Sequence, residues 1–200
     1  KPDGIWAAMN VLRGAKSLRI RHYLYMNDAQ LLQFSRHIML SDFDIAGQER
    51  LLRARVLLIG AGGLGSPIAL YLGAAGVGEL TIVDDDQVDS SNLQRQIAHG
   101  HADIGGNKAT SAAQSVVALN PSTACHAINH RLDADALEAQ IAKTDLVIDA
   151  TDNAETRFLL NRICWQQRTP LVSGAAVRWE FVQLMTGAYW KMPRMSSLTQ

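Results

Sequence analysis

A glycine-rich segment near the middle of the sequence has the residue types and the spacing to bind a phosphate. Gly60-Ala61-Gly62-Gly63-Leu64-Gly65 has the pattern G-x-G-x-x-G. Glycines at these positions let the backbone turn tightly and approach an anion closely. The free N–H groups and the positive dipole end of a following helix attract the same anion. The pattern therefore predicts a nucleotide-binding loop with Gly60, Gly62, Gly63 and Gly65 as its glycines.

The residues on either side of this loop support the same interpretation. An apolar run at 56–59 precedes it, Ser66-Pro67 is a helix start signal, and a second apolar run at 80–83 ends in Asp84-Asp85-Asp86. This order predicts strand, loop, helix and strand, with Asp84 at the carboxyl end of the second strand. There its carboxylate can accept hydrogen bonds from a ribose. A glycine-rich turn without a ligand is the alternative, and it does not explain the acid.

Further polar residues are expected at the same edge of the sheet. Asn92 to Arg95, Gly105 to Lys108 and Thr151-Asp152-Asn153 all follow predicted strands or precede predicted helices. A dinucleotide site needs only the acid after the second strand. Two additional cations and another carboxylate suit a triphosphate with magnesium.

Each of these residues also has an ordinary structural interpretation. Lys108 is predicted in the first turn of a helix, where a cation meets the positive dipole end and loses a few tenths of a kcal/mol. A residue that opposes a local preference is often there for a ligand, but a solvated lysine is the alternative. Arg95 could form a surface salt bridge, and Asp152 could help Asn153 to cap the next helix.

Histidines and cysteines give no comparable signal. His126 and His130 would lie about 13 Å apart on a strand, too far to share a metal. His99 and His101 fall in a polar segment without zinc-spaced partners, so both are expected on the surface. Cys125 and Cys164 are the only cysteines and form no CxxC pair. They are interpreted as packed thiols in a reducing cytoplasm.

Composition excludes several classes of protein. The 200 residues are 48% apolar and have a formal net charge of +0, so the chain lacks the basic character of nucleic-acid-binding proteins. No apolar run approaches the roughly 18 residues that a membrane span needs. We therefore expect neither a nucleic-acid partner nor a membrane, and a cytoplasmic location.

The alternation of predicted strands and helices indicates an α/β fold with a doubly wound, Rossmann-like, mainly parallel sheet and an N-terminal helical segment. We expect this nucleotide-binding domain to span residues 26–186. Residues 1–25 are basic and lack a steady apolar period, so they are interpreted as a disordered or non-native extension. Residues 187–200 are interpreted as a divergent tail. Expected strands lie at 56–59, 80–83, 124–128, 146–150, 171–173 and 181–186, and expected helices at 28–38, 43–53, 66–75, 108–119, 133–142 and 154–164.

Several strings, taken together and in order, resemble a known family. GAGGLG with Asp84, SNLQRQ at 91–96, Lys108, DATDN at 149–153 and PLVSGAA at 170–176 are similar to the ubiquitin-activating-enzyme-like adenylyltransferases. The likeness is greatest to the bacterial molybdopterin-synthase type, followed by the thiamine-pathway sulfur-carrier type. It covers about residues 27–180.

The resemblance implies an activity. Members of this family use ATP to convert the C-terminal glycine carboxylate of a ubiquitin-like sulfur carrier into an acyl-adenylate, with release of pyrophosphate. By resemblance, Asn92, Arg95 and Lys108 contact phosphates, Asp152 positions Mg²⁺, and Arg36 reaches the phosphates of the partner in a homodimer. The implied catalytic residues are Arg36, Arg95, Lys108 and Asp152. The implied nucleotide-binding set is Gly60, Gly62, Gly63, Gly65, Asp84, Asp86, Ser91, Asn92, Arg95, Lys108, Asp152 and Asn153.

The sequence also departs from the family. The resemblance decays after Trp179-Glu180, and the two CxxC pairs that bind zinc in relatives are absent. We therefore expect a truncated chain that keeps the ATP-binding half. A nucleotide-binding remnant without adenylation activity is one alternative. An NAD-dependent dehydrogenase is another, although it does not explain Arg95, Lys108 and Asp152 together. The choice between the molybdopterin and thiamine pathways stays open.

Overall fold

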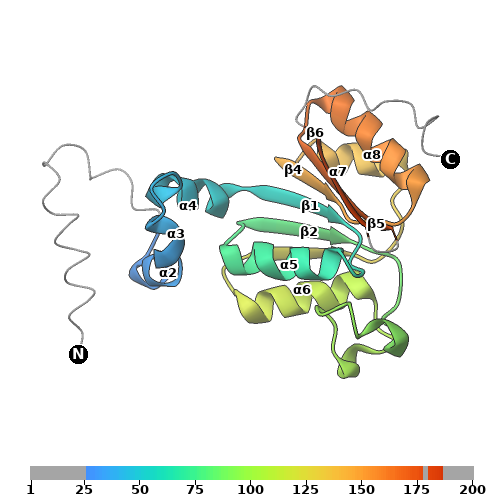
Figure 1. Cartoon of the computed structure of the whole chain (residues 1–200), viewed down its shortest axis with the longest axis horizontal. Coiled ribbons are helices and arrows are strands. Elements are labelled where there is room, and N and C mark those ends of the chain that lie inside the picture. The colour runs from blue at the N-terminus through green and yellow to red at the C-terminus, as the bar shows by residue number, and fades with distance from the viewer. Residues whose placement is uncertain (1–25, 178–179, 187–200) are drawn as a thin grey trace, which may run out of the picture.

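A computed structural model describes residues 26–177 and 180–186, with side-chain surroundings through residue 175 (Figure 1). The predicted extension at 1–25 and the predicted tail at 187–200 lie outside these ranges.

The described residues form a six-stranded sheet in the order β3-β2-β1-β4-β5-β6. Five strands are parallel, and β6 pairs antiparallel with β5. This confirms the prediction of a doubly wound, mainly parallel sheet. The strands are β1 Arg55–Ile59, β2 Glu79–Val83, β3 Ala124–Ile128, β4 Leu146–Asp149, β5 Leu171–Val177 and β6 Glu180–Thr186.

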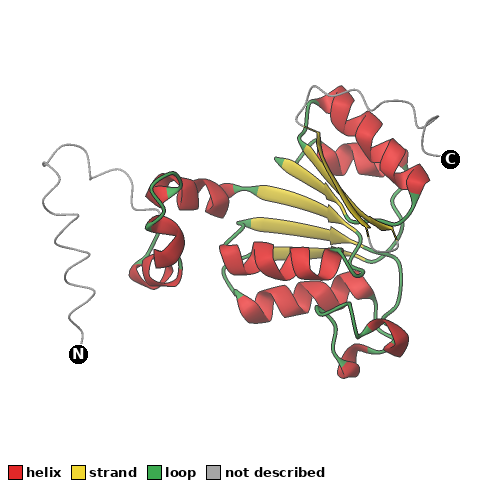
Figure 2. Cartoon of the chain, in the orientation of Figure 1, coloured by secondary structure: helices red, strands yellow, loops and turns green. Residues whose placement is uncertain are grey.

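Helices cover both faces of the sheet (Figure 2). Successive side chains of a strand point to opposite faces, so Leu58 and Leu57 of β1 enter different cores. Helices α5 (Gly65–Ala75) and α6 (Lys108–Leu119) pack on the face of Leu58, and α7 (Ala134–Ile141) and α8 (Ala154–Gln167) pack on the face of Leu57. Leu57 and Leu58 are both fully buried, which explains why the sequence of β1 is a continuous apolar run.

The N-terminal helical segment comprises α2 (Asp28–Gln33), α3 (Ser35–Ile38) and α4 (Asp44–Arg53). One continuous helix was expected at 28–38, but the structure divides it at Phe34. The ring of Phe34 is buried against the end of α5, and a Cβ added at Gly76 would lie 2.6 Å from it. Tertiary packing therefore overrides the helical pattern at this residue.

A buried glutamine fixes the same segment to α5. The Gln48 side chain is fully buried, and its Nε2 donates to the carbonyl of Ala75, 2.9 Å away. Its Oε1 lies 3.0 Å from His37 Nδ1. These contacts place the N-terminal helices at the C-terminal end of α5, whereas the glycine loop lies at the other end (Figure 1).

The long connection between β2 and α6 folds back on itself. Gln87 and Asn107 form an antiparallel bridge, and Val88 exchanges backbone hydrogen bonds with Gly105 and Gly106. The connection contains the short 3₁₀ helices η2 (Ser90–Asn92) and η3 (His101–Asp103). Its two ends are therefore brought together beside the carboxyl end of β2.

Among the residues that the structure describes, no helix combines the length and the apolar character that crossing a membrane requires.

We predict that Gly65→Ala lowers the free energy of unfolding by at least about 2 kcal/mol, because overpacking a tight backbone contact forces neighbouring atoms apart. A Cβ at Gly65 would lie 1.9 Å from the carbonyl oxygen of Gly60. Urea denaturation followed by circular dichroism measures the effect.

Gly63→Ala is the matched control for this prediction, since a Cβ there would meet Arg95 Cδ at an ordinary 3.5 Å. We expect this control to stay within about 0.5 kcal/mol of the unsubstituted protein. Equal stability of the Gly65 and Gly63 variants would contradict the proposed close packing of α5 on β1.

Candidate functional site

The glycine loop connects β1 to α5 and leaves backbone donors free. Gly60 has a φ of +96°, which favours glycine. The N-cap of α5, Leu64, makes no side-chain cap, whereas α2, α6, α7 and α8 are each capped by an Asn or Asp side chain. Within residues 26–177 and 180–186, nothing accepts a hydrogen bond from the N–H of Gly62, Gly63 or Leu64. These groups form a helix N-terminus that can bind an anion.

Asp84 lies at the end of β2 and contacts the loop directly. Its carboxylate accepts hydrogen bonds from the N–H of Ala61 at 2.7 Å and the N–H of Asp86 at 2.9 Å. Burial raises the pKa of Asp84, and these hydrogen bonds and Lys108 oppose that effect. A carboxylate has about four lone-pair positions. Asp84 can therefore hold the loop and still accept hydrogen bonds from a ribose.

Lys108 begins α6, as predicted, and the structure buries it. Its side chain is 9% exposed, and its Nζ lies 2.7 Å from Asp86 Oδ2. The neighbouring Asn107 caps α6 and donates from its Nδ2 to the carbonyls of Asp84 and Asp86. The alternative interpretation of Lys108 as a solvated lysine was wrong. The ammonium group of Lys108 therefore lies beside the carboxyl end of β2 and the N-terminus of α6.

Arg95 and Asn92 lie next to the glycine loop. The Arg95 side chain runs along Gly63, with Cδ 3.5 Å from the position of an added Cβ. Its Nη2 donates to Asn92 Oδ1, 2.6 Å away. Ser91, by contrast, is an exposed residue of η2 whose N–H is bound to Asp89. The guanidinium of Arg95 is exposed and thus open to a ligand at the loop.

Asp152 and Asn153 follow β4, the strand that pairs with β1. The adjoining backbone reaches the loop, since a Cβ at Gly60 would lie 2.9 Å from the carbonyl oxygen of Ala150. The Asn153 side chain caps α8 by accepting from the N–H groups of Glu155 and Thr156. Asp152 is exposed beside it. The cap is therefore made by Asn153, and the carboxylate of Asp152 remains available.

The structure does not bring Arg36 to this site within one chain. Arg36 lies on α3 with the helices that pack at the C-terminal end of α5. The 11 residues of α5 span about 16 Å at 1.5 Å per residue. Arg36 is therefore at the far end of that helix from the glycine loop.

One acidic cluster has metal-ligand spacing among the residues described. Carboxylate oxygens of Asp84, Asp85 and Asp86 lie within 4.8 Å of one another. Carboxylate oxygens suit Mg²⁺, but the ammonium of Lys108 already neutralises Asp86. Asp152 is not part of this cluster.

His99 was expected on the surface, and the structure buries it at 6% exposure. Its Nε2 lies 3.0 Å from the carbonyl oxygen of Ala61, and its Nδ1 lies 2.9 Å from Ser111 Oγ. These partners are 38 and 12 residues away in sequence, so no local spacing marks the contact. His101 is exposed, as expected, and His126 and His130 are also exposed.

Sequence reasoning also missed a buried ionic network at the ends of β4 and β5. The Asp149 carboxylate, 1% exposed, accepts from the hydroxyls of Thr151 and Ser173, both at 2.6 Å. It also pairs with Arg157, whose Nε lies 3.1 Å away. Arg157 in turn donates to the carbonyls of Thr151 and Gly174. The network fixes the backbone that precedes Asp152.

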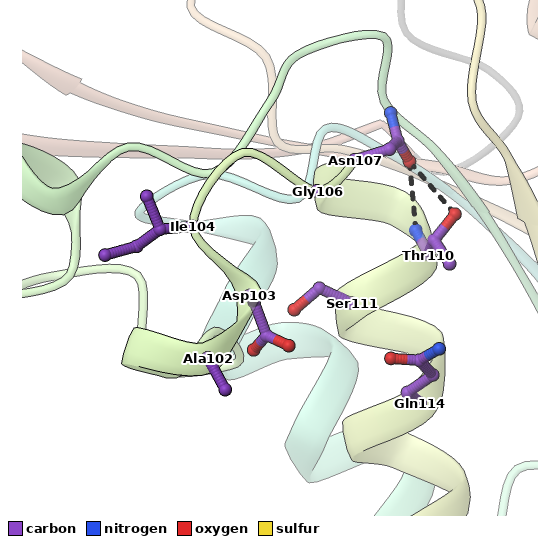
Figure 3. Close-up of a pocket in the computed structure, with 8 residues that line it drawn as sticks. All are labelled: Ala102, Asp103, Ile104, Gly106, Asn107, Thr110, Ser111 and Gln114. Atoms are coloured by element: carbon purple, nitrogen blue, oxygen red, sulfur yellow. Dashed lines mark hydrogen bonds between the residues drawn. The ribbon is translucent and has the colours of Figure 1, made fainter.

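A small pocket lies beside the first turns of α6, and Figure 3 shows the side chains around it. None of the residues predicted to bind the nucleotide lines this pocket. Its lining residues are Ala102, Asp103, Ile104, Gly106, Asn107, Thr110, Ser111 and Gln114.

The fold and the grouped residues define a Rossmann-like domain with a candidate polyphosphate site at the carboxyl edge of its sheet. Residues 34–192 match the ThiF family. The chain therefore belongs to the ThiF family. The match extends beyond residue 180, where the sequence resemblance was expected to end.

Curated relatives support this assignment. The chain is 46% identical over 157 residues to the SAMP-activating enzyme E1 of Haloferax volcanii, covering 78% of this chain and 58% of that protein. It is 46% identical over 155 residues to the molybdopterin-synthase adenylyltransferase of Escherichia coli, covering 78% and 62%. It is 45% identical over 152 residues to the sulfur carrier protein ThiS adenylyltransferase of Escherichia coli, covering 76% and 61%. The chain is thus homologous to adenylyltransferases and spans about three fifths of their length.

Solved structures agree with the fold. The tRNA N6-threonylcarbamoyladenosine dehydratase TcdA of E. coli superposes with a TM-score of 0.70 at 26% identity, covering 76% of this chain and 64% of that one. PaaA superposes with a TM-score of 0.71 at 22% identity, covering 86% and 55%. At that identity, PaaA supports the fold alone.

We predict that Asp149→Asn lowers the free energy of unfolding by about 3 kcal/mol, because it leaves the Arg157 guanidinium without its buried counter-charge. Thermal or urea unfolding of the ligand-free protein measures this. The matched control is Asp152→Asn three residues later, which removes an exposed carboxylate. The control is expected to unfold like the unsubstituted protein. An Asp149→Asn variant as stable as this control would contradict the structural role of the network.

We predict that both cysteines react slowly with iodoacetamide in the folded protein. Burial disfavours the thiolate and raises the pKa of Cys125 to about 11 and the pKa of Cys164 to about 12. At pH 8 only on the order of one Cys125 thiol in a thousand is then ionised, and only the thiolate reacts. Mass spectrometry at pH 8 should show labelling that accelerates strongly when urea unfolds the chain. Rapid labelling of either folded thiol would contradict these pKa shifts.

Proposed function

We propose that the chain binds ATP at the carboxyl edge of its sheet and transfers AMP to the C-terminal glycine carboxylate of a ubiquitin-like sulfur carrier. The names of the relatives support this reaction class: they include a molybdopterin-synthase adenylyltransferase and a ThiS adenylyltransferase. Of the alternatives left open by the sequence, family membership disfavours an NAD-dependent dehydrogenase. The proposed carrier belongs to the molybdopterin or thiamine pathway.

The observation that carries the proposal is the placement of Lys108. Its side chain is 9% exposed, and the residue begins α6, at a helix N-terminus where a cation is locally disfavoured. The Asp86 carboxylate balances the positive charge of Lys108 on one side. The uncapped N-terminus of α5 faces the same edge of the sheet. A polyphosphate bound there would receive N–H groups from the loop and a positive charge from Lys108.

Each predicted residue then has a chemical role. Asp84 accepts hydrogen bonds from the ribose, and the glycine loop with Asn92 and Arg95 binds phosphate oxygens. Asp86 orients Lys108, and Ser91 and Asn153 shape the backbone on either side. Asp152 would hold Mg²⁺, and carboxylate oxygen is the ligand type that this ion prefers. When bound, the ion would neutralise phosphate charge.

The reaction needs no general base. A C-terminal carboxylate has a pKa of about 3.5 and is ionised at pH 7. One of its oxygens forms a bond to the α-phosphorus, the bond from that phosphorus to the bridging oxygen breaks, and pyrophosphate leaves. Both reactants are anions. Catalysis therefore depends on positioning and on charge neutralisation by Arg95 and Lys108.

Arg36 fits the proposal only across a homodimer. Its own chain places it at the far end of α5 from the loop, so a contribution to phosphate binding would come from a second copy. We propose such a homodimer as the active assembly.

We predict that Lys108→Ala reduces carrier-dependent ATP–pyrophosphate exchange by about 100-fold, because it removes a positioned cation from the developing phosphate charge. The assay uses the full-length protein with carriers of the molybdopterin and thiamine pathways. Lys143→Ala is the control, since that exposed lysine lies just beyond α7. Exchange by Lys108→Ala equal to the control would rule out the assigned role.

Calorimetry separates the alternatives for the chain itself. We expect heat from Mg-ATP and none from NAD. Binding of NAD in preference to ATP would favour a dehydrogenase, and ATP binding without exchange would favour a nucleotide-binding protein that does not adenylate.

A further inference from the structure

The backbone of Ala61 in the glycine loop is held by three side chains, one from α5 and two from the connection between β2 and α6. Its N–H donates to Asp84 at 2.7 Å. Its carbonyl oxygen accepts from Ser66 Oγ at 3.0 Å and lies 3.0 Å from His99 Nε2. Ala61 is fully buried, and a carbonyl oxygen has two lone pairs. Both acceptor positions and the donor of this residue are therefore used.

The chemistry of these partners fixes where the proton of His99 lies. A carbonyl oxygen only accepts hydrogen bonds, so Nε2 must carry the proton that it donates to Ala61. In neutral imidazole Nδ1 is then an acceptor. The hydroxyl of Ser111, 2.9 Å away, must donate to it. The carbonyl of Ala61 thus selects the tautomer of His99, and Ser111 holds the ring in the orientation that binds the loop.

The planar peptide bond between Ala61 and Gly62 makes the direction of the Gly62 N–H depend on the direction of the Ala61 carbonyl. In a planar trans peptide the C=O and the N–H point in opposite directions. The carbonyl of Ala61 is directed to His99 and Ser66, so the N–H of Gly62 faces away from them. Gly62 is partly exposed. Its N–H is one of the loop donors without a partner in the described part of the chain.

The same histidine connects the two halves of the candidate phosphate site. Ser111 lies on α6 one turn beyond Lys108, and Ala61 belongs to the loop before α5. The hydrogen bonds from Ser111 to His99 and from His99 to Ala61 therefore join α6, which carries the Lys108 ammonium, to the glycine loop with its free N–H groups.

We propose that His99 is a positioning residue for the nucleotide, acting through Ala61 to orient the N–H of Gly62 and depending on Ser111 for the orientation of its ring. The proposal rests on ATP binding at this loop. His99 itself touches no phosphate.

Substitution of Ser111 tests the proposal away from the ligand. Ser111→Ala removes the donor to Nδ1, so we expect the Kd for Mg-ATP to rise about fivefold, the worth of one such hydrogen bond. Ser111→Thr keeps the hydroxyl and should restore affinity. Ser111 lines the pocket in Figure 3, which leaves room for the added methyl group.

Ser115→Ala is the matched control. Ser115 lies on the same helix, and its Oγ donates to the carbonyl of Ala98, 2.6 Å away. It fixes the same connection without touching the His99 ring. We expect its Kd for Mg-ATP to stay within about twofold of the unsubstituted protein. An equal loss of affinity in Ser111→Ala and Ser115→Ala would show that only the rigidity of the connection matters, and would overturn the proposal.

Substitution of His99 separates its two nitrogens. His99→Gln can place an amide N–H where Nε2 lies and should keep the Kd within about twofold, whereas His99→Asn cannot reach Ala61 and should raise it about tenfold. Thermal unfolding without ligand verifies that both variants fold. The ¹⁵N shifts of the His99 ring should show the Nε2–H tautomer in the unsubstituted protein and also in Ser111→Ala, because the carbonyl of Ala61 is present in both.

The outcomes distinguish this proposal from the one on which it rests. Absence of Mg-ATP binding by the unsubstituted protein would overturn the proposed function and, with it, the role of His99. Normal ATP binding with unchanged affinity in Ser111→Ala and His99→Asn would overturn the role of His99 alone. An Nδ1–H tautomer in the unsubstituted protein would do the same.

Discussion

The close contact between Gly65 and Gly60 is the constraint on which the rest of the structure depends. A Cβ at Gly65 would lie 1.9 Å from the Gly60 carbonyl oxygen, so only glycine lets α5 begin this close to the end of β1. The start of α5 thereby lies at the carboxyl edge of the parallel sheet. The neighbouring strands β2 and β4 end at the same edge and bring Asp84 and Asp152 there. The position of the proposed nucleotide site is therefore set by strand order and by the absence of a side chain at Gly65.

The polar groups at this edge divide into two sets. The Asp149 carboxylate is paired with Arg157 and accepts hydrogen bonds from the hydroxyls of Thr151 and Ser173, so this buried network stabilises the fold. The loop N–H groups, Arg95 and Asp152 remain open. Lys108 is intermediate, since it is paired with Asp86 yet lies beside the open donors. Burial alone therefore does not distinguish the proposed binding residues from structural ones, whereas unused hydrogen-bonding capacity separates the two sets.

The sequence predicted those parts of the fold whose signals are local. Helix α6 and strand β3 begin and end at the predicted residues, because Asn107 caps α6 and Asn120-Pro121 ends it. Lys108 and the glycine loop were found for the same reason. His99 was missed because its partners are remote in sequence, and its polar neighbours suggested a surface loop. Asp149 was missed as a network centre because Ser173 comes from another strand. The division of the first helix at Phe34 likewise depends on Gly76 of α5.

Backbone hydrogen bonds join the two ends of the connection between β2 and α6, and this closure has an evolutionary consequence. The Gln87–Asn107 bridge and the Val88 hydrogen bonds join its ends, and residues 100–102 and 104 within it are exposed. Lengthening a loop whose ends are already joined costs little entropy. The exposed stretch at 100–104 can therefore accept insertions, while the residues at the joined ends of the connection keep their positions. Such insertions would change the surface of the domain and leave its candidate phosphate site intact.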